Sequence, residues 1–264
     1  MDIALPVILG IIQGITEWLP ISSSGHGMIV MMQFFNLNPD IALSIAMYLH
    51  TGTLLAVIVK FRDEIKGIVK SIPEFRHDKL IQFLTVSTLF TGVVGVPIYL
   101  LLRHVFLLEY ANSAMLFIGF CLILTGFILY VSKKRFDAKG TDDIGINEMI
   151  IAGIAQGFAV LPGISRSGMT ISSLLLLGVK QDDSLRLSFI MSIPAVIGAV
   201  LLSLTDENLL NIGFLPLLIG IIIAFVFGYL TIGILMEISE KLRFDFFCIF
   251  FGILTLAFSL FNYL

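Results

Sequence analysis

Polar side chains gather in a short segment near the beginning of the chain, where the surrounding sequence is apolar. The segment contains the carboxylate of Glu17, the amide of Gln13 and the imidazole of His26. Gln13 and Glu17 are four residues apart, so they share one face of a helix. A carboxylate within an apolar segment needs a cation, a metal ion or a proton beside it. The segment therefore predicts a buried polar site.

A run of serines between Glu17 and His26 offers hydroxyl groups and backbone N–H groups. Ser22, Ser23 and Ser24 are followed by Gly25, and a helix is expected to begin here. The N–H groups and the dipole at the start of a helix favour anions. His26 lies one turn beyond Ser23, where it could activate the hydroxyl or protonate a leaving group. The segment predicts an anion site with a candidate nucleophile.

A second polar segment, in the later half of the chain, supplies the opposite charge. Its arginine, Arg166, has a planar guanidinium that suits bidentate binding of phosphate and offsets the charge of Glu17. Hydroxyl and glycine residues around it form a second cradle: Ser165, Ser167, Gly168 and Thr170. The two segments together predict a phosphate-binding site.

Plainer explanations of these residues stay open. Glu17 and Arg166 could form a purely structural ion pair, and small residues such as Ser and Gly commonly serve close helix packing in membranes. His50 lies within an apolar stretch, where it could either bond a neighbouring helix or line the same cavity. No Walker loop, dinucleotide fingerprint or Cys/His metal spacing occurs in the sequence.

The elements that must hold these residues are membrane spans. The chain has 264 residues, of which 58% are hydrophobic and 13% charged, whereas soluble domains carry about 25% charged residues. No basic cluster resembles a nucleic-acid footprint. Apolar stretches of spanning length, free of charged residues, lie at about 41–59, 81–102, 114–132, 187–204, 213–235 and 246–264. The composition predicts an all-α polytopic membrane protein with six transmembrane helices in a single integral membrane domain, 1–264.

The two polar segments lie in apolar regions of a different kind. Residues 3–36 and 147–179 are each interrupted near the middle by Pro, Gly and Ser, so neither half spans a bilayer comfortably. We expect each region to form a re-entrant helical hairpin. Irregular backbone at membrane depth is tolerated only where it is buried in protein or faces water. The turns of the hairpins should therefore line a cavity.

The placement of Lys and Arg predicts the orientation of the spans. With six spans and two hairpins, nearly all of the 16 Lys and Arg residues fall on one side, in the segments 60–80, 133–139, 180–186 and 241–243. Only Arg103 falls on the other side. These segments are expected in the cytoplasm, with both termini outside. The first hairpin then enters from outside and the second from the cytoplasm.

The two hairpins also resemble each other. Gln13 and Gly25 are twelve residues apart, as are Gln156 and Gly168. Two repeats, about 1–135 and 144–264, would each contain one hairpin and three spans. Because three is odd, the repeats would have opposite orientations in the membrane, an inverted-topology repeat that brings two broken helices together near the midplane.

At these two segments the chain resembles the bacterial undecaprenyl-pyrophosphate phosphatase family of the bacitracin-resistance type. That family has a Glu/Gln-x-x-x-Glu segment followed by Pro-x-Ser-Ser-x-Gly-His, and a Pro-Gly-x-Ser-Arg-Ser-Gly-x-Thr segment. The matching segments here are Gln13 to Glu17, Pro20 to His26, and Pro162 to Thr170. The resemblance covers nearly the whole chain in length and in the order of its spans.

The resemblance implies hydrolysis of undecaprenyl pyrophosphate to the monophosphate and inorganic phosphate, which recycles a carrier lipid for cell-wall synthesis. It implies the bacterial cytoplasmic membrane, with the active site facing the outer side, and a divalent cation, Mg²⁺ or Ca²⁺. The expected partners are the prenyl pyrophosphate lipid and the surrounding membrane lipid, with no nucleic acid. A homodimer is left open.

The expected roles follow the matching residues. Ser23, activated by His26, attacks the phosphate, and Arg166 stabilises the developing charge; attack by water with His26 as base is the close alternative. Glu17 binds the metal or orients His26 or water, with Gln13 as a tentative second metal ligand. Gln13 is neutral where some family members have Glu, which weakens any mechanism that needs two carboxylates. The expected phosphate-binding residues are Ser22, Ser24, Gly25, Ser165, Ser167, Gly168 and Thr170.

A secondary transporter is the competing function, because inverted repeats with broken helices are also a transporter architecture. Glu17 would then carry a proton and Arg166 would bind an anionic substrate. The cluster of serines with His26 favours the phosphatase, since transport does not need it. A phosphatase that also moves the lipid phosphate across the membrane is left open.

Overall fold

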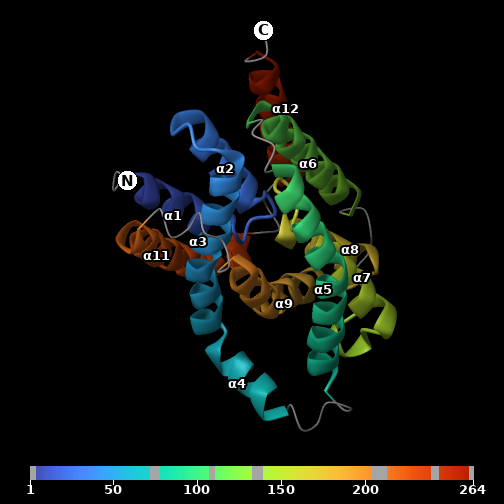
Figure 1. The fold of residues 1–264 in the computed structure, drawn as a ribbon. Coiled ribbons are helices and arrows are strands. Elements are labelled where there is room, and N and C mark those ends of the chain that lie inside the picture. The colour runs from blue at the N-terminus through green and yellow to red at the C-terminus, as the bar shows by residue number, and fades with distance from the viewer. Residues whose placement is uncertain are drawn as a thin grey trace.

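The computed structural model describes residues 4–71, 78–106, 111–132, 139–203, 213–238 and 244–261. This part of the chain is almost entirely helical, and its β-structure is limited to an isolated bridge between Lys139 and Val179. The helices form one bundle in which long helices surround the two polar segments (Figure 1). The all-α prediction is confirmed.

Two runs of helices follow each other along the chain. The first run consists of α1 (Ala4–Thr16), α2 (Ser23–Phe34), α3 (Pro39–Lys60), α4 (Arg62–Ser71), α5 (Lys79–Phe106) and α6 (Ala111–Ser132). A short 3₁₀ turn, η2 (Thr141–Asp143), precedes the second run. That run consists of α7 (Ile146–Phe158), α8 (Arg166–Leu176), α9 (Gln181–Ser203), α11 (Phe214–Ile238) and α12 (Phe244–Phe261).

Five of these helices are long and apolar enough to cross a membrane. They cover Pro39–Lys60, Lys79–Leu102, Ala114–Ser132, Gln181–Leu202 and Phe214–Leu235, so the protein is a multi-pass membrane protein. The sixth expected span falls on α12, whose described part is shorter than these five. Residues 262–264 of that span lie outside the described chain, and the sixth crossing stays a prediction.

Each polar segment folds as two short helices joined by a turn, as expected for a hairpin. The turns lie between α1 and α2 and between α7 and α8. The second helix of each pair begins with the same cap: the Ser22 side-chain oxygen accepts from the Gly25 N–H at 3.3 Å, and that of Ser165 accepts from the Gly168 N–H at 3.1 Å. A serine at this position satisfies a backbone N–H that the helix leaves unpaired. The caps therefore fix where each returning helix starts.

The first helix of each hairpin packs against the other half of the chain. Helix α1 lies along α11, and α7 lies along α5. Glycines allow the close approach: a Cβ atom added at Gly14 would lie 2.6 Å from Phe227 Cβ, and one added at Gly153 would lie 2.4 Å from the Ser87 carbonyl oxygen. Small residues at helix contacts let backbones approach in membranes. This reciprocal packing is what two related halves would produce, whereas their opposite orientation in the membrane stays a prediction.

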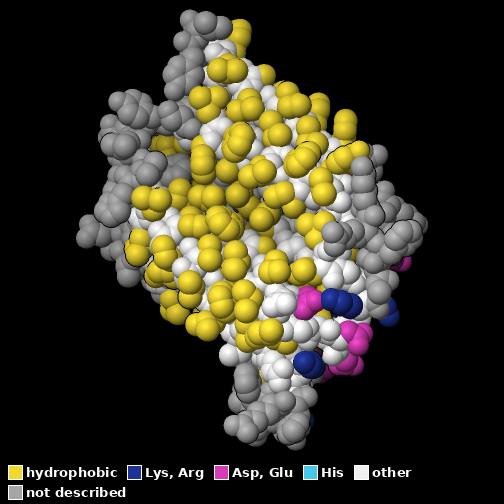
Figure 2. Space-filling view, turned by 90° about the vertical axis from the view of Figure 1, so that its right-hand side faces the viewer, with side chains coloured by type: hydrophobic (Ala, Val, Ile, Leu, Met, Phe, Trp, Pro, Cys, Tyr) yellow, Lys and Arg dark blue, Asp and Glu magenta, His cyan; other side chains and the backbone are white. Residues whose placement is uncertain are grey.

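Charged side chains gather at one end of the bundle, below a broad hydrophobic face (Figure 2). The segments expected on the cytoplasmic side meet here. Arg186 pairs with Glu64, and the Thr141 hydroxyl donates to Asp183 at 2.9 Å. Within the described residues, the segments 60–71, 78–80, 139–143 and 180–186 thus share this end, as the charge pattern requires. The predicted cytoplasmic residues Arg76, Lys133, Lys134, Arg135, Lys241 and Arg243 lie outside the described chain.

Candidate active site

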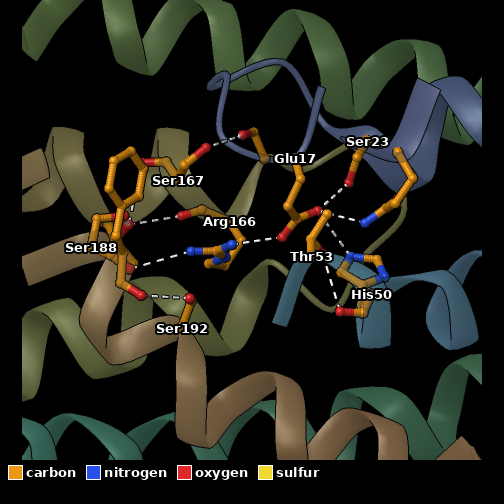
Figure 3. A network of polar contacts seen from close by, with 12 residues as sticks. Glu17, Ser23, His50, Thr53, Arg166, Ser167, Ser188 and Ser192 are labelled. Carbon is orange, nitrogen blue, oxygen red and sulfur yellow. Dashed lines mark hydrogen bonds and ion pairs between the residues drawn. The ribbon is translucent and has the colours of Figure 1, made fainter. Parts of the chain in front are cut away.

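The two hairpin turns meet at the carboxylate of Glu17, which is buried between them (Figure 3). Arg166 Nη2 donates to Glu17 Oε1 at 2.6 Å. The Ser23 hydroxyl donates to Glu17 Oε2 at 2.6 Å, and Gln13 Nε2 donates to the same oxygen at 2.9 Å. Groups from both halves of the chain therefore hold this carboxylate, as the sequence predicts for Glu17 and Arg166.

His50, on α3, joins the same cluster. Its Nε2 atom lies 3.2 Å from Glu17 Oε2, and its Nδ1 atom lies 2.7 Å from the Ala46 carbonyl oxygen one turn earlier. The sequence left His50 open between two roles, and the structure places it at the wall of the cavity. A titratable side chain within an otherwise apolar span is the signal that could have assigned it to the site, because such residues are costly to keep there without use.

The guanidinium of Arg166 is fixed in its plane from two further directions. Arg166 Nη1 donates to the Ser188 carbonyl oxygen at 3.2 Å. The guanidinium also lies over the Trp18 ring, 5.6 Å from its centroid, and that ring packs edge-on against Phe189. Stacking and a planar set of donors suit Arg rather than Lys. Ser188 and Phe189 lie in a segment that also resembles the family, but their support of Arg166 could not be predicted, because they lie on a separate helix, α9.

The turns are also tied directly to each other. The Ser22 hydroxyl oxygen accepts from the Gly163 N–H at 3.1 Å, and the Ser167 hydroxyl donates to the Leu19 carbonyl oxygen at 3.1 Å. Gly163 has a φ of +92°, in the left-handed region that favours glycine. A Cβ atom at this position would lie 2.5 Å from the Ile118 carbonyl oxygen. The second turn therefore needs glycine here to reach the first.

A cavity opens beside Glu17, and only part of the predicted phosphate cradle lines it. Ser22, Ser23, Ser24, Ser165 and Arg166 line this cavity together with Glu17 and His50. The other predicted residues bond to protein groups behind its wall. The N–H groups of Gly25 and Gly168 donate to the capping serines, Ser167 bonds the first turn, and the Thr170 hydroxyl lies 2.5 Å from that of Ser188. These residues shape the turns rather than face the cavity.

The expected contact between Ser23 and His26 is not formed. His26 Nδ1 lies 2.8 Å from the Ser22 carbonyl oxygen, and the ring packs against Phe251 of α12 at a centroid distance of 5.3 Å. His26 Nε2 has no hydrogen-bond partner among the described residues. Ser23 turns instead toward the hairpin turn and donates to Glu17. Spacing along one helix correctly placed the two residues close together, but it did not determine where their side chains point.

The two residues expected to bind a metal, Glu17 and Gln13, are bonded to protein groups in the described chain. Hard cations such as Mg²⁺ and Ca²⁺ take several oxygen ligands, and Mg²⁺ is commonly held by one or two carboxylates together with substrate phosphates and water. Among the described residues, Glu17 is the one carboxylate that lines the cavity, and both of its oxygens already accept hydrogen bonds. Gln13 directs its amide nitrogen, not its carbonyl oxygen, at Glu17. Within the described chain, no group of three or more His, Cys, Asp or Glu side chains is placed to hold a metal.

Comparison with known proteins agrees with the two motifs. The family model described as bacitracin resistance protein BacA matches residues 6–257. A protein of Methanothrix thermoacetophila is 43% identical over 97% of both chains, and one of Methanococcoides burtonii is 40% identical over 97% of both. A third, from Saccharolobus solfataricus, is 38% identical over 96% of this chain and 94% of its own. All three relatives are named undecaprenyl-diphosphatase. Because the match covers both hairpins and every helix that holds the site, the chain belongs to the BacA family.

Proposed function

We propose that the protein hydrolyses the phosphoanhydride bond of undecaprenyl pyrophosphate, which yields undecaprenyl phosphate and inorganic phosphate. One observation carries the proposal: a serine hydroxyl, a carboxylate and a fixed guanidinium converge on one cavity between two helix beginnings. The substrate follows from the names of the relatives. The product is the carrier lipid that cell-wall synthesis uses again.

Ser23 is the nucleophile in this mechanism, and Glu17 replaces His26 as its base. The hydroxyl already donates to Glu17 Oε2 at 2.6 Å, so its proton can pass to the carboxylate as its oxygen attacks the terminal phosphorus. The bond between that phosphorus and the bridging oxygen breaks, and its electron pair leaves with undecaprenyl phosphate. Water then hydrolyses the phosphoserine and restores Ser23. Direct attack by water, with Glu17 as base, is the alternative.

Arg166 stabilises the negative charge that develops on the transferred phosphoryl group. Phosphoryl transfer depends mainly on positioning and on electrostatic stabilisation of this kind. Glu17, Ser188 and Trp18 hold the guanidinium in one plane before substrate arrives, so little reorganisation is needed. His50 positions Glu17 from the opposite side through its Nε2 atom.

The remaining expectations complete the proposal. The protein acts in the cytoplasmic membrane, with its cavity facing the outer side; the gathering of basic segments at one end of the bundle supports this orientation. A divalent cation would take its ligands mainly from the pyrophosphate, because the cavity offers one carboxylate that is already bonded. A homodimer stays open. Family membership favours hydrolysis over the transport that the same architecture would allow.

Phosphate release from undecaprenyl pyrophosphate by the detergent-purified protein tests the function directly. We expect release by the wild type and a loss of at least about 2 kcal/mol of transition-state stabilisation in Arg166→Ala, as for single donors removed from other sites. Glu17→Ala should be at least as severe. Adding EDTA tests the cation.

Folded wild-type protein that releases no phosphate under any lipid or cation condition would contradict the proposal. If Ser23→Ala retained substantial turnover and no phosphoserine could be trapped by rapid quench, the attack would belong to water instead.

A further inference from the structure

A second, apolar cavity adjoins the cavity beside Glu17. The two share five wall residues on α3, α5, α9 and the second hairpin turn, namely Met47, Thr91, Val160, Ala195 and Ala199. Beyond them the second cavity runs between α5 and α9, two helices that lie side by side in Figure 1. We call this second cavity the α5–α9 groove. Its remaining wall residues are Thr88, Gly92, Gly95, Val96, Tyr99, Pro194, Gly198 and Leu202.

Two glycines keep the α5–α9 groove open. A Cβ atom added at Gly92 or at Gly198 would meet nothing within 4 Å. Most other glycines in the described spans are used for close helix contacts, as Gly52 on α3 is against α11. Since the two open glycines serve no such contact and both line the groove, side chains at these positions would project into it.

The corresponding gap on the other side of the bundle is closed. There α3 packs directly on α11, and a Cβ atom added at Gly52 would lie 2.4 Å from the Ile221 carbonyl oxygen. In the predicted repeat, α3 corresponds to α9 and α11 corresponds to α5. The contact between α3 and α11 therefore corresponds to the groove between α9 and α5. Among the described helices, the contact that corresponds to the groove is therefore closed.

Exposed apolar side chains lie next in sequence to the groove residues Gly92 and Leu202. Val93 on α5 and Leu201 on α9 are 59% and 60% exposed. Both lie within helices that cross the membrane, so these side chains face lipid. The two helices that form the groove therefore contact the hydrocarbon region, and the groove shares wall residues with the cavity beside Glu17.

We propose that the α5–α9 groove binds the first units of the substrate's prenyl chain, next to the pyrophosphate. Continuity of the two cavities favours this occupant over an ordinary bilayer lipid, because the apolar groove begins at the wall of the phosphate cavity. A prenyl chain is joined directly to its pyrophosphate, whereas a glycerophospholipid has polar ester groups between its phosphate and its acyl chains. The proposal rests on the function proposed above. It adds that Gly92 and Gly198 determine the affinity for the chain without touching the reacting atoms.

Leucine substitutions at the two glycines test the groove by comparing two substrates with the same head. Undecaprenyl pyrophosphate would fill the groove, whereas dimethylallyl pyrophosphate, with one prenyl unit, occupies mainly the cavity beside Glu17. Gly92→Leu and Gly198→Leu should raise KM for the long substrate at least about tenfold, the effect of losing a few buried methylene contacts. Both variants should leave kcat/KM for the short substrate within about twofold of the wild-type value, which is much less than the tenfold change expected for the long substrate.

Gly67→Leu is the matched control, because Gly67 also lies in a helix with nothing near its Cβ position but is far along α4 from the groove. This control should change neither KM nor kcat/KM for either substrate. Equal losses on both substrates in the groove variants, or an unchanged KM for the long one, would overturn the proposal.

A photoreactive probe keeps this test separate from catalysis. Farnesyl phosphate with a diazirine on its terminal prenyl unit should crosslink to peptides from α5 and α9, with a lower yield in Gly92→Leu. Crosslinks confined to other helices would contradict the groove. If the wild type released no phosphate yet crosslinked at α5 and α9, the proposed hydrolysis would fail while the groove stood.

Discussion

Glu17 accepts hydrogen bonds from donors on four separate segments, and this convergence explains why a carboxylate can be kept at membrane depth. Arg166 supplies the balancing charge, and Ser23, Gln13 and His50 surround the second oxygen. Breaking a buried pair by removing one partner leaves a charge uncompensated. Removing any one of these donors should therefore shift the Glu17 carboxylate as well as remove the hydrogen bond of that donor.

At His50 this argument separates two substitutions. His50→Ala removes the donor beside Glu17 Oε2, and we expect kcat/KM to fall by about tenfold or more, as when a supporting partner of a site is lost. His50→Gln should retain most of the activity, because its amide nitrogen can reach the same oxygen. Phosphate release by equal amounts of folded protein measures kcat/KM for the two variants. Equal activity of the two variants would show that His50 does not position Glu17.

At the scale of the elements, glycines determine how closely the hairpins approach the spans. Helix α7 meets α5 at Gly153 and Gly157, and α1 meets α11 at Gly10 and Gly14. Each pair is spaced by four residues, so both members lie on one face of their helix. The hairpins are thereby held at the depth where their turns can meet.

Gly153→Ala should show the energetic weight of this contact. The added Cβ would lie 2.4 Å from a backbone oxygen of α5, so we expect thermal unfolding to reveal a loss of about 1–3 kcal/mol from overpacking. The loss should occur although Ala favours a helix over Gly by about 1 kcal/mol.

Gly67→Ala provides the comparison, because its Cβ position on α4 is open. This variant should be neutral or more stable than the wild type. A gain in stability from Gly153→Ala would mean that α5 and α7 are not in close contact.

At the scale of the whole molecule, polar contacts gather at the charged end of the bundle. Lys139 Nζ lies 2.6 Å from Glu148 Oε1, in the first turn of α7, and Glu148 Oε2 accepts from the Gly145 N–H at 3.0 Å. The hydrogen bond from Lys139 lowers the pKa of Glu148 below the usual value for a carboxyl group. The same end carries the pair between Arg186 and Glu64, which connects α9 with α4.

This contact predicts a dependence of stability on pH. Because the pKa of Glu148 is lower in the folded protein, its contribution is fully present above the unfolded pKa and is lost as pH falls through the folded pKa. Near neutral pH, the free energy of unfolding of the wild type should exceed that of Glu148→Gln by about 1 kcal/mol, the scale of a helix cap. This difference should shrink in acid. Thermal unfolding at several pH values measures it.

Asp63→Asn is the control for this prediction. Asp63 pairs with Lys66, but its side chain is 79% exposed, and exposed pairs contribute little to stability. The control should unfold like the wild type at every pH. A constant gap between wild type and Glu148→Gln across the acid range would contradict the assignment.

The sequence alone determined the class of the protein, the two polar hairpins and most of the residues at their turns. These conclusions depend on local composition: a bilayer requires long apolar helices, and the clusters of Pro, Gly and Ser at the two turns interrupt them. The family also followed from the sequence, because the residues of both motifs are contiguous along the chain.

Only the tertiary structure decided which of those residues face the cavity. It turned Ser23 toward Glu17 and His26 toward α12, brought His50 and Ser188 into the site from separate helices, and opened a groove between α5 and α9. The physical reason is that side-chain direction and contacts between distant helices depend on how whole helices pack, and no local pattern in the chain records that packing.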